Sequence, residues 1–362
     1  MDSNKLFYIL NNFDDSYDEN KYLTVLRKNV NLLEKLKHNK NRINNQKNWD
    51  IAKKFANTYE FIFSFNNDGV SNVFPISRSY FKLIEILQDN DILKDITEIR
   101  SACLCEGPGG FIQAINDAFR DKAYLHPIQC ITLISEDKKV PNWKLNNIDN
   151  YKISYGADKT GNIYNLQNIK HFVMEVGVNS CNLVTADGGF DFSRDFNSQE
   201  QDFSLLLLCE IYTCLQIQAE GGVFVVKMFD LFHETTLNII SLLRMFYEEL
   251  TIHKPKTSRP ANSEKYIICK NFSKKNINIL SFVQDQIQKK SVNIFNIIHK
   301  DLMYNTLLHI YEYNDLFVNS QIFHIEKTLN IMSNNVYNKY ANIKFCVDWC
   351  KQYNIPIKAN WV

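Results

Sequence analysis

The sequence of 362 residues carries 41 Lys and Arg against 40 Asp and Glu, for a formal net charge of +1, and 45% of its residues are hydrophobic. This length and hydrophobic content suffice for one large core, and the near-neutral charge excludes binding of nucleic acid through overall basicity, so any phosphate contacts must come from local clusters. The nine cysteines include neither a C-x-x-C pair nor a matching pair of histidines, which favours reduced thiols of an intracellular protein over a zinc site.

Nothing in the sequence predicts a membrane or a secretory segment. The N-terminal MDSNKLFYIL lacks a charged region followed by a long apolar run, so we expect no signal peptide. The most apolar helical pattern, DFSLLLLCEIYTCLQIQ, contains Asp202 and Glu210 and is too short and too polar to cross a bilayer. We expect an intracellular protein of the cytoplasm or the nucleus.

Residues 1–70 predict a helical N-terminal extension. Leu and Val recur at helical spacing in residues 21–54, where Lys and Arg outnumber the acidic residues. A solvated helix face explains that charge most simply, and a face that contacts RNA is the alternative. Residues 273–362 predict a second helical extension, whose aromatic residues recur at the spacing of a packed core.

Between these extensions, residues 71–272 alternate short β-rich runs with helical patterns. The β-rich runs are SACLCE, IQCITLIS, CNLVTAD, GGVFVVKMF, LTIHKPK and EKYIICKNF. Such alternation predicts a Rossmann-like α/β domain with a mostly parallel sheet and helices on both faces. The last two runs flank the turn-rich TSRPANS and predict an antiparallel hairpin at the edge of the sheet.

The first strand-to-helix turn, CEGPGG, is a candidate ligand site, because open parallel sheets bind ligands beyond the carboxyl ends of their strands. Gly107, Gly109 and Gly110 permit a sharp turn and a close approach of the backbone, with packing alone as the alternative. The turn lacks the Lys and Ser or Thr of a P-loop. Glu106 would repel a pyrophosphate and attract an amine or a sulfonium, which favours S-adenosylmethionine over NAD.

Four ionisable residues stand at element boundaries in this region, and each alone is most simply an exposed terminal charge. They are Lys82, Asp187, Lys227 and Glu264. Together and in this order they resemble the Lys-Asp-Lys-Glu tetrad of RNA 2′-O-methyltransferases. The chain resembles the FtsJ/RrmJ-type methyltransferases from about Arg78 to Asn271, and within them the mRNA cap ribose methyltransferases of eukaryotes and large DNA viruses.

The segments that carry this resemblance are SRSYFKLIEI, CEGPGGF, YGADKTGNI, TADGGFD, VVKMFDLF and KPKTSRPANSEKY. They combine features of the enzymes that methylate the first transcribed nucleotide with features of those that methylate the second, so the position stays open. The resemblance implies S-adenosylmethionine as methyl donor, capped mRNA as substrate and no metal. The compact chain and its abundance of Asn, Lys and Ile favour a viral or protist origin, in the viral case with a place in the viral factory or virion.

The resemblance also implies which residues contact the ligands. The cofactor contacts would be Glu106, Gly107, Pro108, Gly109, Gly110, Asp158 and Asp187. Glu136 or Asp137 follows the run ITLIS, and a contact with the cofactor ribose and a simple surface acid are equally good interpretations of it. The RNA phosphates would pass near Lys82 and contact Lys254, Lys256, Arg259 and Lys265.

The implied reaction is in-line transfer of a methyl group to a ribose 2′-hydroxyl, which needs a base in reach and a fixed approach. We expect Lys227 to deprotonate or to orient this hydroxyl, while Asp187 and Glu264 hold the lysines and Lys82 steadies the oxygen. Desolvation and Lys82 lower the pKa of Lys227 and the two carboxylates raise it, so the sequence leaves the net direction open.

Two alternatives remain. A ribosomal or transfer RNA ribose 2′-O-methyltransferase of the same fold is disfavoured by SRPANSE and by the long flanks. A catalytically silent RNA-binding subunit of a capping complex is disfavoured by the intact tetrad and loop. The helical flanks are candidate surfaces for other capping or transcription proteins.

Overall fold

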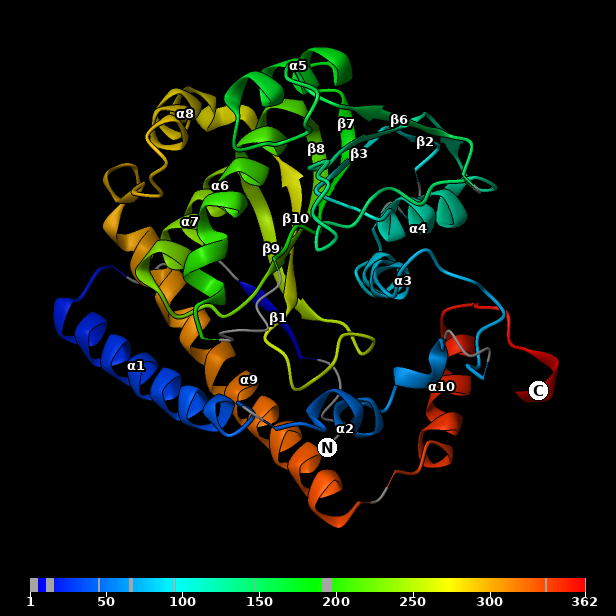
Figure 1. The fold of residues 1–362 in the computed structure, drawn as a ribbon. Coiled ribbons are helices and arrows are strands. Elements are labelled where there is room, and N and C mark those ends of the chain that lie inside the picture. The colour runs from blue at the N-terminus through cyan, green and yellow to red at the C-terminus, as the bar shows by residue number, and fades with distance from the viewer. Residues whose placement is uncertain are drawn as a thin grey trace.

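The fold is built on an eight-stranded sheet with the strand order β1-β9-β10-β8-β7-β3-β5-β6 (Figure 1). The computed structural model describes residues 6–10, 16–44, 46–64, 68–92, 94, 96–146, 148–190, 197–335 and 337–361. The strands of the sheet are β1 (Leu6–Leu10), β3 (Ser101–Leu104), β5 (Ile128–Ile131), β6 (Tyr151–Ser154), β7 (Cys181–Ala186), β8 (Gln218–Met228), β9 (Tyr247–Lys254) and β10 (Lys265–Phe272). A small parallel pair, β2 (Glu98–Ile99) and β4 (Tyr124–Leu125), lies apart from it.

The predicted α/β class is confirmed by the pairing of these strands. Neighbours from β6 through β5, β3 and β7 to β8 are parallel. β10 then pairs antiparallel with both β8 and β9, so the predicted hairpin of β9 and β10 is present and β10 is its inner strand. This register sets Tyr266 beside Lys227 and brings the start of β10 to the carboxyl end of β8.

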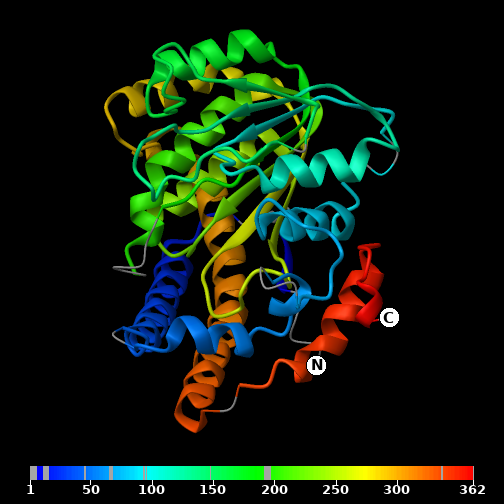
Figure 2. The ribbon, with the colours of Figure 1, turned by 45° about the vertical axis from the view of Figure 1, so that its right-hand side comes forward.

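Helices cover both faces of the sheet (Figures 1 and 2). They are α1 (Glu19–Asn41), α2 (Trp49–Ala56), α3 (Ser79–Asp89), α4 (Gly110–Phe119), α5 (Leu166–Val176), α6 (Gln199–Ile217), α7 (Glu234–Phe246), α8 (Leu280–Gln288), α9 (Lys300–Asn334) and α10 (Tyr340–Gln352). Phe224 and Val226 of β8 pack into the apolar core with α5, α6 and α7, whereas Val223 and Val225 pack with α3, α4 and α10. A strand buried on both faces explains the apolar run VFVV that precedes Lys227.

The expectation of a helical segment at the N-terminus is wrong for residues 6–10. This segment, LFYIL, forms strand β1 and pairs antiparallel with β9, from Leu6 opposite Lys254 to Leu10 opposite Leu250. Its apolar and aromatic composition suits a strand, and the backbone of β9 would otherwise remain an unpaired edge. The partner that decides between helix and strand is more than 200 residues away, so local pattern alone could not show it.

The two terminal extensions pack against each other and against the α/β domain. α1 and α9 lie side by side in both ribbon views, and Lys35 Nζ of α1 donates a hydrogen bond to Asn319 Oδ1 of α9 at 2.8 Å (Figures 1 and 2). α10 packs against α3, where the rings of Trp349 and Phe81 make an edge-to-face contact with centroids 5.8 Å apart. Among the described residues, no helix is long and apolar enough to span a bilayer.

Candidate active site

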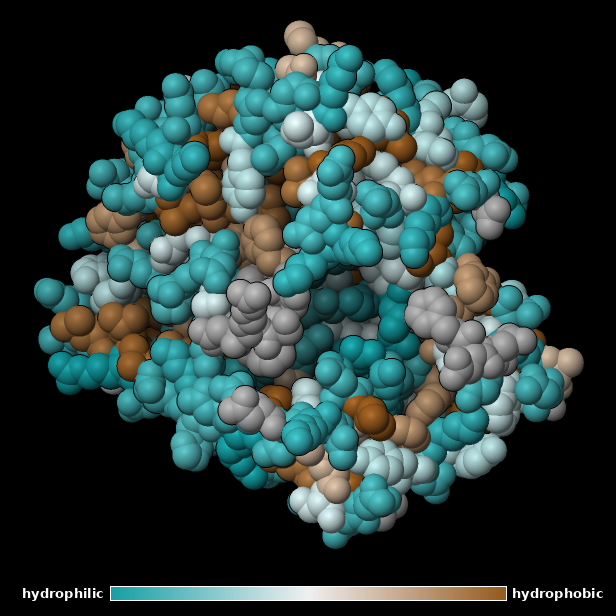
Figure 3. All heavy atoms as spheres, in the orientation of Figure 1, coloured by the Kyte–Doolittle hydropathy of each residue, from teal (hydrophilic) through white to brown (hydrophobic). Residues whose placement is uncertain are grey.

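An open cleft of about 1530 Å³ lies beyond the carboxyl ends of β3, β5, β7 and β8. Its lining brings together residues that are far apart in the sequence, among them Lys82, Gly107, Asp187, Lys227 and Glu264. In the space-filling view, the face has a central hollow whose floor is coloured hydrophilic (Figure 3). In the folded protein, all four residues of the predicted tetrad therefore line the same cleft.

The first pair of the tetrad joins helix α3 to the segment that precedes β10. Lys82 Nζ lies 2.7 Å from Glu264 Oε1 and donates a hydrogen bond to Glu264 Oε2 at 2.9 Å. Both side chains are mostly buried, with 16% of Lys82 and 13% of Glu264 exposed. Ser258 Oγ donates a further hydrogen bond to Glu264 Oε1 at 2.8 Å, so the carboxylate is held from two sides.

The second pair lies at the ends of the neighbouring strands β7 and β8. Lys227 Nζ donates a hydrogen bond to the carbonyl oxygen of Asp187 at 2.7 Å and lies 3.3 Å from its carboxylate Oδ1. Tyr266, which the sequence analysis did not single out, donates its hydroxyl hydrogen to the same Oδ1 at 2.8 Å. A β-carbon on Gly189 would lie 3.0 Å from Lys227 Nζ, so the Gly-Gly turn leaves just enough room for the ammonium.

The sequence left open whether the pKa of Lys227 is raised or lowered, and the structure shows the direction. Burial lowers the pKa of Lys227, but Asp187 and Glu264 raise it by more, so the pKa lies above its ordinary value. Burial likewise raises the pKa of Glu264, and the surrounding lysines, with Lys82 first, more than offset this and hold it below the usual range of a carboxyl. At neutral pH the described site therefore holds a charged Lys227 and a charged Glu264.

The Gly-rich turn divides its glycines between a ligand surface and packing. Gly107 and Pro108 line the cleft. Gly109, with φ of +118°, ends the turn where Leu145 occupies the space of a β-carbon, and Ser77 and Ser79 occupy that space at Gly110. The turn thus combines the two predicted roles, ligand contact and packing. Its first half faces the cleft, and its second half lets α4 pack closely against its neighbours.

Glu106 fits the charge expected of a cofactor amine. The residue is only 3% exposed, and Thr185 Oγ1 donates a hydrogen bond to its Oε1 at 2.9 Å. No described residue donates to Oε2, which is also buried. Burial raises the pKa of this carboxyl well above its ordinary value, which favours its neutral form unless a cation lies beside it. The ammonium group of a bound ligand would favour the carboxylate and would supply the donor that Oε2 lacks.

The carboxylate of Asp158 is bound by residues of its own loop, and its contact with the cofactor stays a prediction. Its carboxylate is exposed and is not part of the cleft lining. It accepts hydrogen bonds from the backbone and hydroxyl of Thr160, at 2.9 and 2.6 Å, and from the amides of Asn165 and Asn168, each at 2.8 Å. These bonds hold the pKa of Asp158 well below its usual range. Asp158 therefore shapes the loop whose next residues, 161–164, line the cleft.

Two of the four lysines and arginines expected to contact RNA are interior residues. Lys265 is 0% exposed and donates to the carbonyl oxygen of Phe229 at 2.5 Å, and burial lowers its pKa to about 7. Lys254 is also buried, and its Nζ donates to the carbonyl oxygen of Glu264 at 2.6 Å. The expectation that these side chains contact phosphate is wrong, because the strands β9 and β10 turn them inward beneath the site.

The other two residues lie nearer the surface but already have contacts. Arg259 donates hydrogen bonds to both carboxylate oxygens of Glu60, at 2.8 and 3.0 Å, and its side chain is 31% exposed. Lys256 Nζ lies 5.9 Å from the ring centroid of Tyr59. Neither lines the open cleft, whose lining contains Lys47, Lys53, Arg78 and Lys139 besides the two lysines of the tetrad. The RNA-binding role of Arg259 and Lys256 stays a prediction.

Asp137 lies in the cleft lining just after β5, at the position where the sequence analysis placed a ribose contact. Glu136 is exposed and is not in that lining. Of the two acids that were weighed, Asp137 is therefore the one in reach of a ligand in the cleft. Its role stays a prediction.

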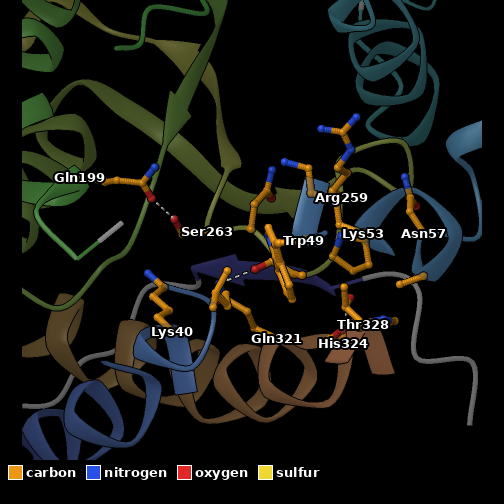
Figure 4. Close-up of a pocket in the computed structure, with 15 residues that line it drawn as sticks. Lys40, Trp49, Lys53, Asn57, Gln199, Arg259, Ser263, Gln321, His324 and Thr328 are labelled. Atoms are coloured by element: carbon orange, nitrogen blue, oxygen red, sulfur yellow. Dashed lines mark hydrogen bonds between the residues drawn. The ribbon is translucent and has the colours of Figure 1, made fainter. Parts of the chain in front are cut away.

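A second pocket of about 210 Å³ adjoins the cleft, with Trp49, Lys53 and Gln199 in the walls of both cavities. Figure 4 shows it between α2, the segment that holds Arg259 and Ser263, and helix α9. Gln321 Oε1 and His324 Nδ1 are buried on its wall, and no described residue bonds to either atom. Sequence reasoning missed this pocket, because its walls come from both terminal extensions.

Comparison with known proteins identifies the family of this region. The profile of a family described as FtsJ-like methyltransferase matches residues 75–272, which is more than half of the chain. The cap-specific mRNA (nucleoside-2′-O-)-methyltransferase 1 of Dictyostelium discoideum is 30% identical over 81% of this chain and 42% of its own length. The cap-specific mRNA (nucleoside-2′-O-)-methyltransferase 2 of Drosophila melanogaster is 31% identical over 55% of this chain and 30% of its own length.

A third relative is inactive, as its name states. The inactive cap-specific mRNA (nucleoside-2′-O-)-methyltransferase 1B of Caenorhabditis briggsae is 30% identical over 60% of this chain and 26% of its own length. The chain thus spans less than half the length of each of these three relatives. Sequence identity of about 30% therefore does not distinguish an active protein from an inactive one. The residues of the site have to show which of the two this chain is.

Proposed function

The chain belongs to the FtsJ-like methyltransferase family, and we propose that it transfers a methyl group from S-adenosylmethionine to a ribose 2′-hydroxyl near the 5′ cap of mRNA. The observation that carries this proposal is the assembly of Lys82, Asp187, Lys227 and Glu264 on one cleft. Two buried lysine–carboxylate pairs at the carboxyl edge of a parallel sheet are suited to hold a hydroxyl group in a fixed position.

The residues around the Gly-rich turn fit S-adenosylmethionine. Bound there, S-adenosylmethionine would supply the methyl group from its sulfonium. Glu106 offers a buried carboxylate oxygen that lacks a donor, which suits the cofactor's ammonium group. Gly107 and Pro108 present backbone to the cleft, and Asp137 is the candidate acceptor for ribose hydroxyls.

In this proposal Lys227 orients the 2′-hydroxyl. Its raised pKa keeps it charged, and a charged lysine donates hydrogen bonds but cannot accept a proton. We therefore assign the positioning of the oxygen to Lys227 and Lys82, with the hydroxyl proton passing to water in the cleft. Asp187 and Glu264 hold the two ammonium groups at 2.7–3.3 Å and so limit where the hydroxyl can lie.

The pocket beside the cleft supports a capped RNA over a ribosomal or transfer RNA. A nucleobase is flat and has a polar edge, and proteins hold such bases by stacking and by hydrogen bonds to that edge. Trp49 supplies an aromatic wall, and the buried atoms Gln321 Oε1 and His324 Nδ1 supply unpaired polar partners. We propose that this pocket receives the guanine of the cap while the adjoining nucleotides lie in the cleft.

The test is transfer of tritium from labelled S-adenosylmethionine to short RNAs that begin with m7GpppA, m7GpppAm, GpppA or pppA, with Lys227→Ala as the inactive control. Label on the m7GpppA and not on the m7GpppAm transcript assigns the first nucleotide. Label on both assigns the second. Transfer that ignores the cap contradicts the proposal in favour of another RNA, and binding of S-adenosylmethionine without transfer to any transcript favours a silent subunit.

A further inference from the structure

A buried carboxylate lies one helical turn beyond Lys82, on the same side of α3. Glu85 is 0% exposed, and residues three apart on a helix share one face. Nothing in the proposed reaction uses this side chain directly. Its contacts nevertheless join three parts of the molecule that meet only in the folded protein.

Both carboxylate oxygens of Glu85 accept hydrogen bonds. The backbone N–H of Lys256 donates to Oε1 at 2.6 Å. The backbone N–H and the hydroxyl of Thr257 each donate to Oε2 at 3.2 Å, and Trp349 Nε1 of α10 donates to the same oxygen at 3.3 Å. One side chain of α3 thus binds the segment after β9 and a helix of the C-terminal extension.

This segment leads directly to the catalytic carboxylate. Next to Thr257, Ser258 Oγ donates to Glu264 Oε1 at 2.8 Å, and Lys254 Nζ donates to the carbonyl oxygen of Glu264 at 2.6 Å. Glu264 in turn pairs with Lys82 on α3. α3 and the segment 254–264 are therefore joined twice, by Lys82 with Glu264 inside the cleft and by Glu85 with Lys256 and Thr257 behind it.

We infer that Glu85 is a positioning residue for the tetrad, which fixes the distance between Lys82 and Glu264 independently of the ion pair that these two residues form. The inference rests on the proposed function, since it concerns the same site. It also gives α10 a role in catalysis, because the indole N–H of Trp349 completes the hydrogen bonds of Glu85.

Two physical arguments favour positioning over packing alone. A buried carboxyl group is less favourable than an apolar side chain of the same volume, whereas a fully bonded polar group fixes a unique geometry. Glu85, Asp89 and His253 also offer ligand atoms within 4.8 Å of one another, which is compatible with a metal ion. Because four donors already occupy both oxygens of Glu85, we assign this carboxylate to hydrogen bonding.

The test compares Glu85→Gln with two matched variants, called the α10 variants here, at Trp349 in α10 and at Tyr353 directly after it. Trp349→Phe removes the N–H that reaches Glu85. Tyr353→Phe removes the hydroxyl that donates to Asp89 Oδ1 of α3 at 3.0 Å, a bond that does not involve Glu85. The measurements are kcat and KM for capped RNA, the Kd of S-adenosylmethionine by calorimetry, and hydrogen exchange of the Lys256 and Thr257 amides.

We expect Glu85→Gln to lower kcat at least tenfold and to speed exchange of both amides, with the Kd of S-adenosylmethionine within twofold of the wild type. Trp349→Phe should lower kcat several-fold, and Tyr353→Phe should leave it within twofold. An unchanged kcat in Glu85→Gln overturns the inference. If that variant does not fold, equal effects of the two α10 variants overturn it. If the wild type transfers no methyl group at all, the proposed function fails, and the exchange data alone test the link from Glu85 to the segment.

Discussion

At the scale of single residues, burial and neighbouring charge together determine the pKa values of Lys227, Glu106 and Glu210. Burial lowers the pKa of Lys227 and the carboxylates around it raise it, and the carboxylates prevail. At Glu106 and Glu210 burial prevails, so the pKa of each carboxyl is raised. The outcome depends on how many opposite charges lie within a few ångströms, which only the folded structure determines.

The charge of Lys227 makes its role testable by substitution. We expect Lys227→Arg to lower methyl transfer at least 100-fold, because a guanidinium does not fit where Gly189 leaves room for an ammonium alone. The Kd of S-adenosylmethionine, measured by calorimetry, should stay within threefold of the wild type. Retained turnover would contradict the steric limit that we assign to Gly189 and would show that a guanidinium can replace the ammonium.

The pH dependence of the wild type separates the two roles of Lys227. A lysine that accepted the proton would make kcat rise about tenfold per pH unit below its raised pKa, since the neutral fraction grows by that factor. A charged lysine that only orients the hydroxyl predicts a kcat that does not rise in this way between pH 7 and 9. Single-turnover rates across this range measure the difference, and a slope of one would assign Lys227 as the base.

Glu210 predicts a pH dependence of stability. Its side chain is 0% exposed, the backbone N–H of Gly188 donates to its Oε1 at 3.2 Å, and burial raises its pKa to about 8. The pKa of this carboxyl is higher in the folded state than in the unfolded state. The folded protein is therefore destabilised as pH rises through the interval between the two pKa values, here from about 4.5 to about 8.

Glu210→Gln should therefore be more stable than the wild type at pH 9, and the difference should shrink toward pH 5. The upper limit of the change is about 1.4 kcal/mol per pH unit within that interval. Urea unfolding at pH 5, 7 and 9 measures it. Glu34→Gln, at an exposed glutamate on α1, is the control and should show no such trend. A difference that does not vary with pH would contradict the assignment.

At the scale of elements, the segment between β9 and β10 explains which basic residues can meet RNA. Sequence position alone suggested four of them, since all lie near Glu264. The strands turn Lys254 and Lys265 into the interior, and α2 supplies Lys53 to the cleft instead. A strand alternates its side chains between two faces, so neighbours in sequence separate into buried and exposed positions.

This assignment predicts different salt dependences for two lysine variants. Each phosphate contact contributes a slope of about −0.7 to the logarithm of affinity against the logarithm of salt concentration for single-stranded RNA. Lys53→Ala should weaken binding of a capped ten-nucleotide RNA and make this slope shallower by about 0.7. Lys265→Met should keep the wild-type slope. Fluorescence anisotropy at several salt concentrations measures both, and the reverse result would restore Lys265 as a phosphate contact.

At the scale of the whole molecule, the terminal extensions support the α/β domain from outside the matched family region. Lys40 of α1 pairs with Asp230, which follows the strand of Lys227, and both side chains are 5% exposed. Asn29 of α1 accepts a hydrogen bond from Asn314 of α9 at 2.9 Å, and Asn314 also donates to the carbonyl oxygen of Leu231 at 2.8 Å. The extensions therefore contact the segment that directly follows β8, the strand of Lys227.

Breaking the pair of Lys40 and Asp230 should destabilise the protein. Removing one partner of a buried ion pair typically costs about 3–5 kcal/mol, because the other charge stays buried. We expect Lys40→Met to lower the free energy of unfolding by that amount and Lys40→Met with Asp230→Asn to recover most of the loss. Urea denaturation measures both, and equal losses in the single and double variants would show that the pair itself is not the cause.

The sequence by itself determined the α/β class, the hairpin of β9 and β10 and the family, which the strand pairing and the family comparison confirm. These features are local: they depend on periodicity, turn residues and motifs. The division into residues 1–70, 71–272 and 273–362 stays a prediction, as does the catalytic role of the tetrad. The tetrad was predicted from its resemblance to a family motif. Asp187, Lys227 and Glu264 lie at strand ends, which the sheet brings together, and α3 adds Lys82 to the same cleft.

Only the tertiary structure decided the features that depend on distant partners. Strand β1 exists because β9 offers an edge, Asp158 turns to its own loop, and Lys254 and Lys265 lie inside. No sequence motif marks Tyr266, Glu85 or the pocket beside Trp49, because their neighbours come from distant segments, such as Trp349, which is 264 residues from Glu85. Local patterns specify backbone conformation, whereas burial and charge at a site depend on which segments meet, and that is fixed only when the chain folds.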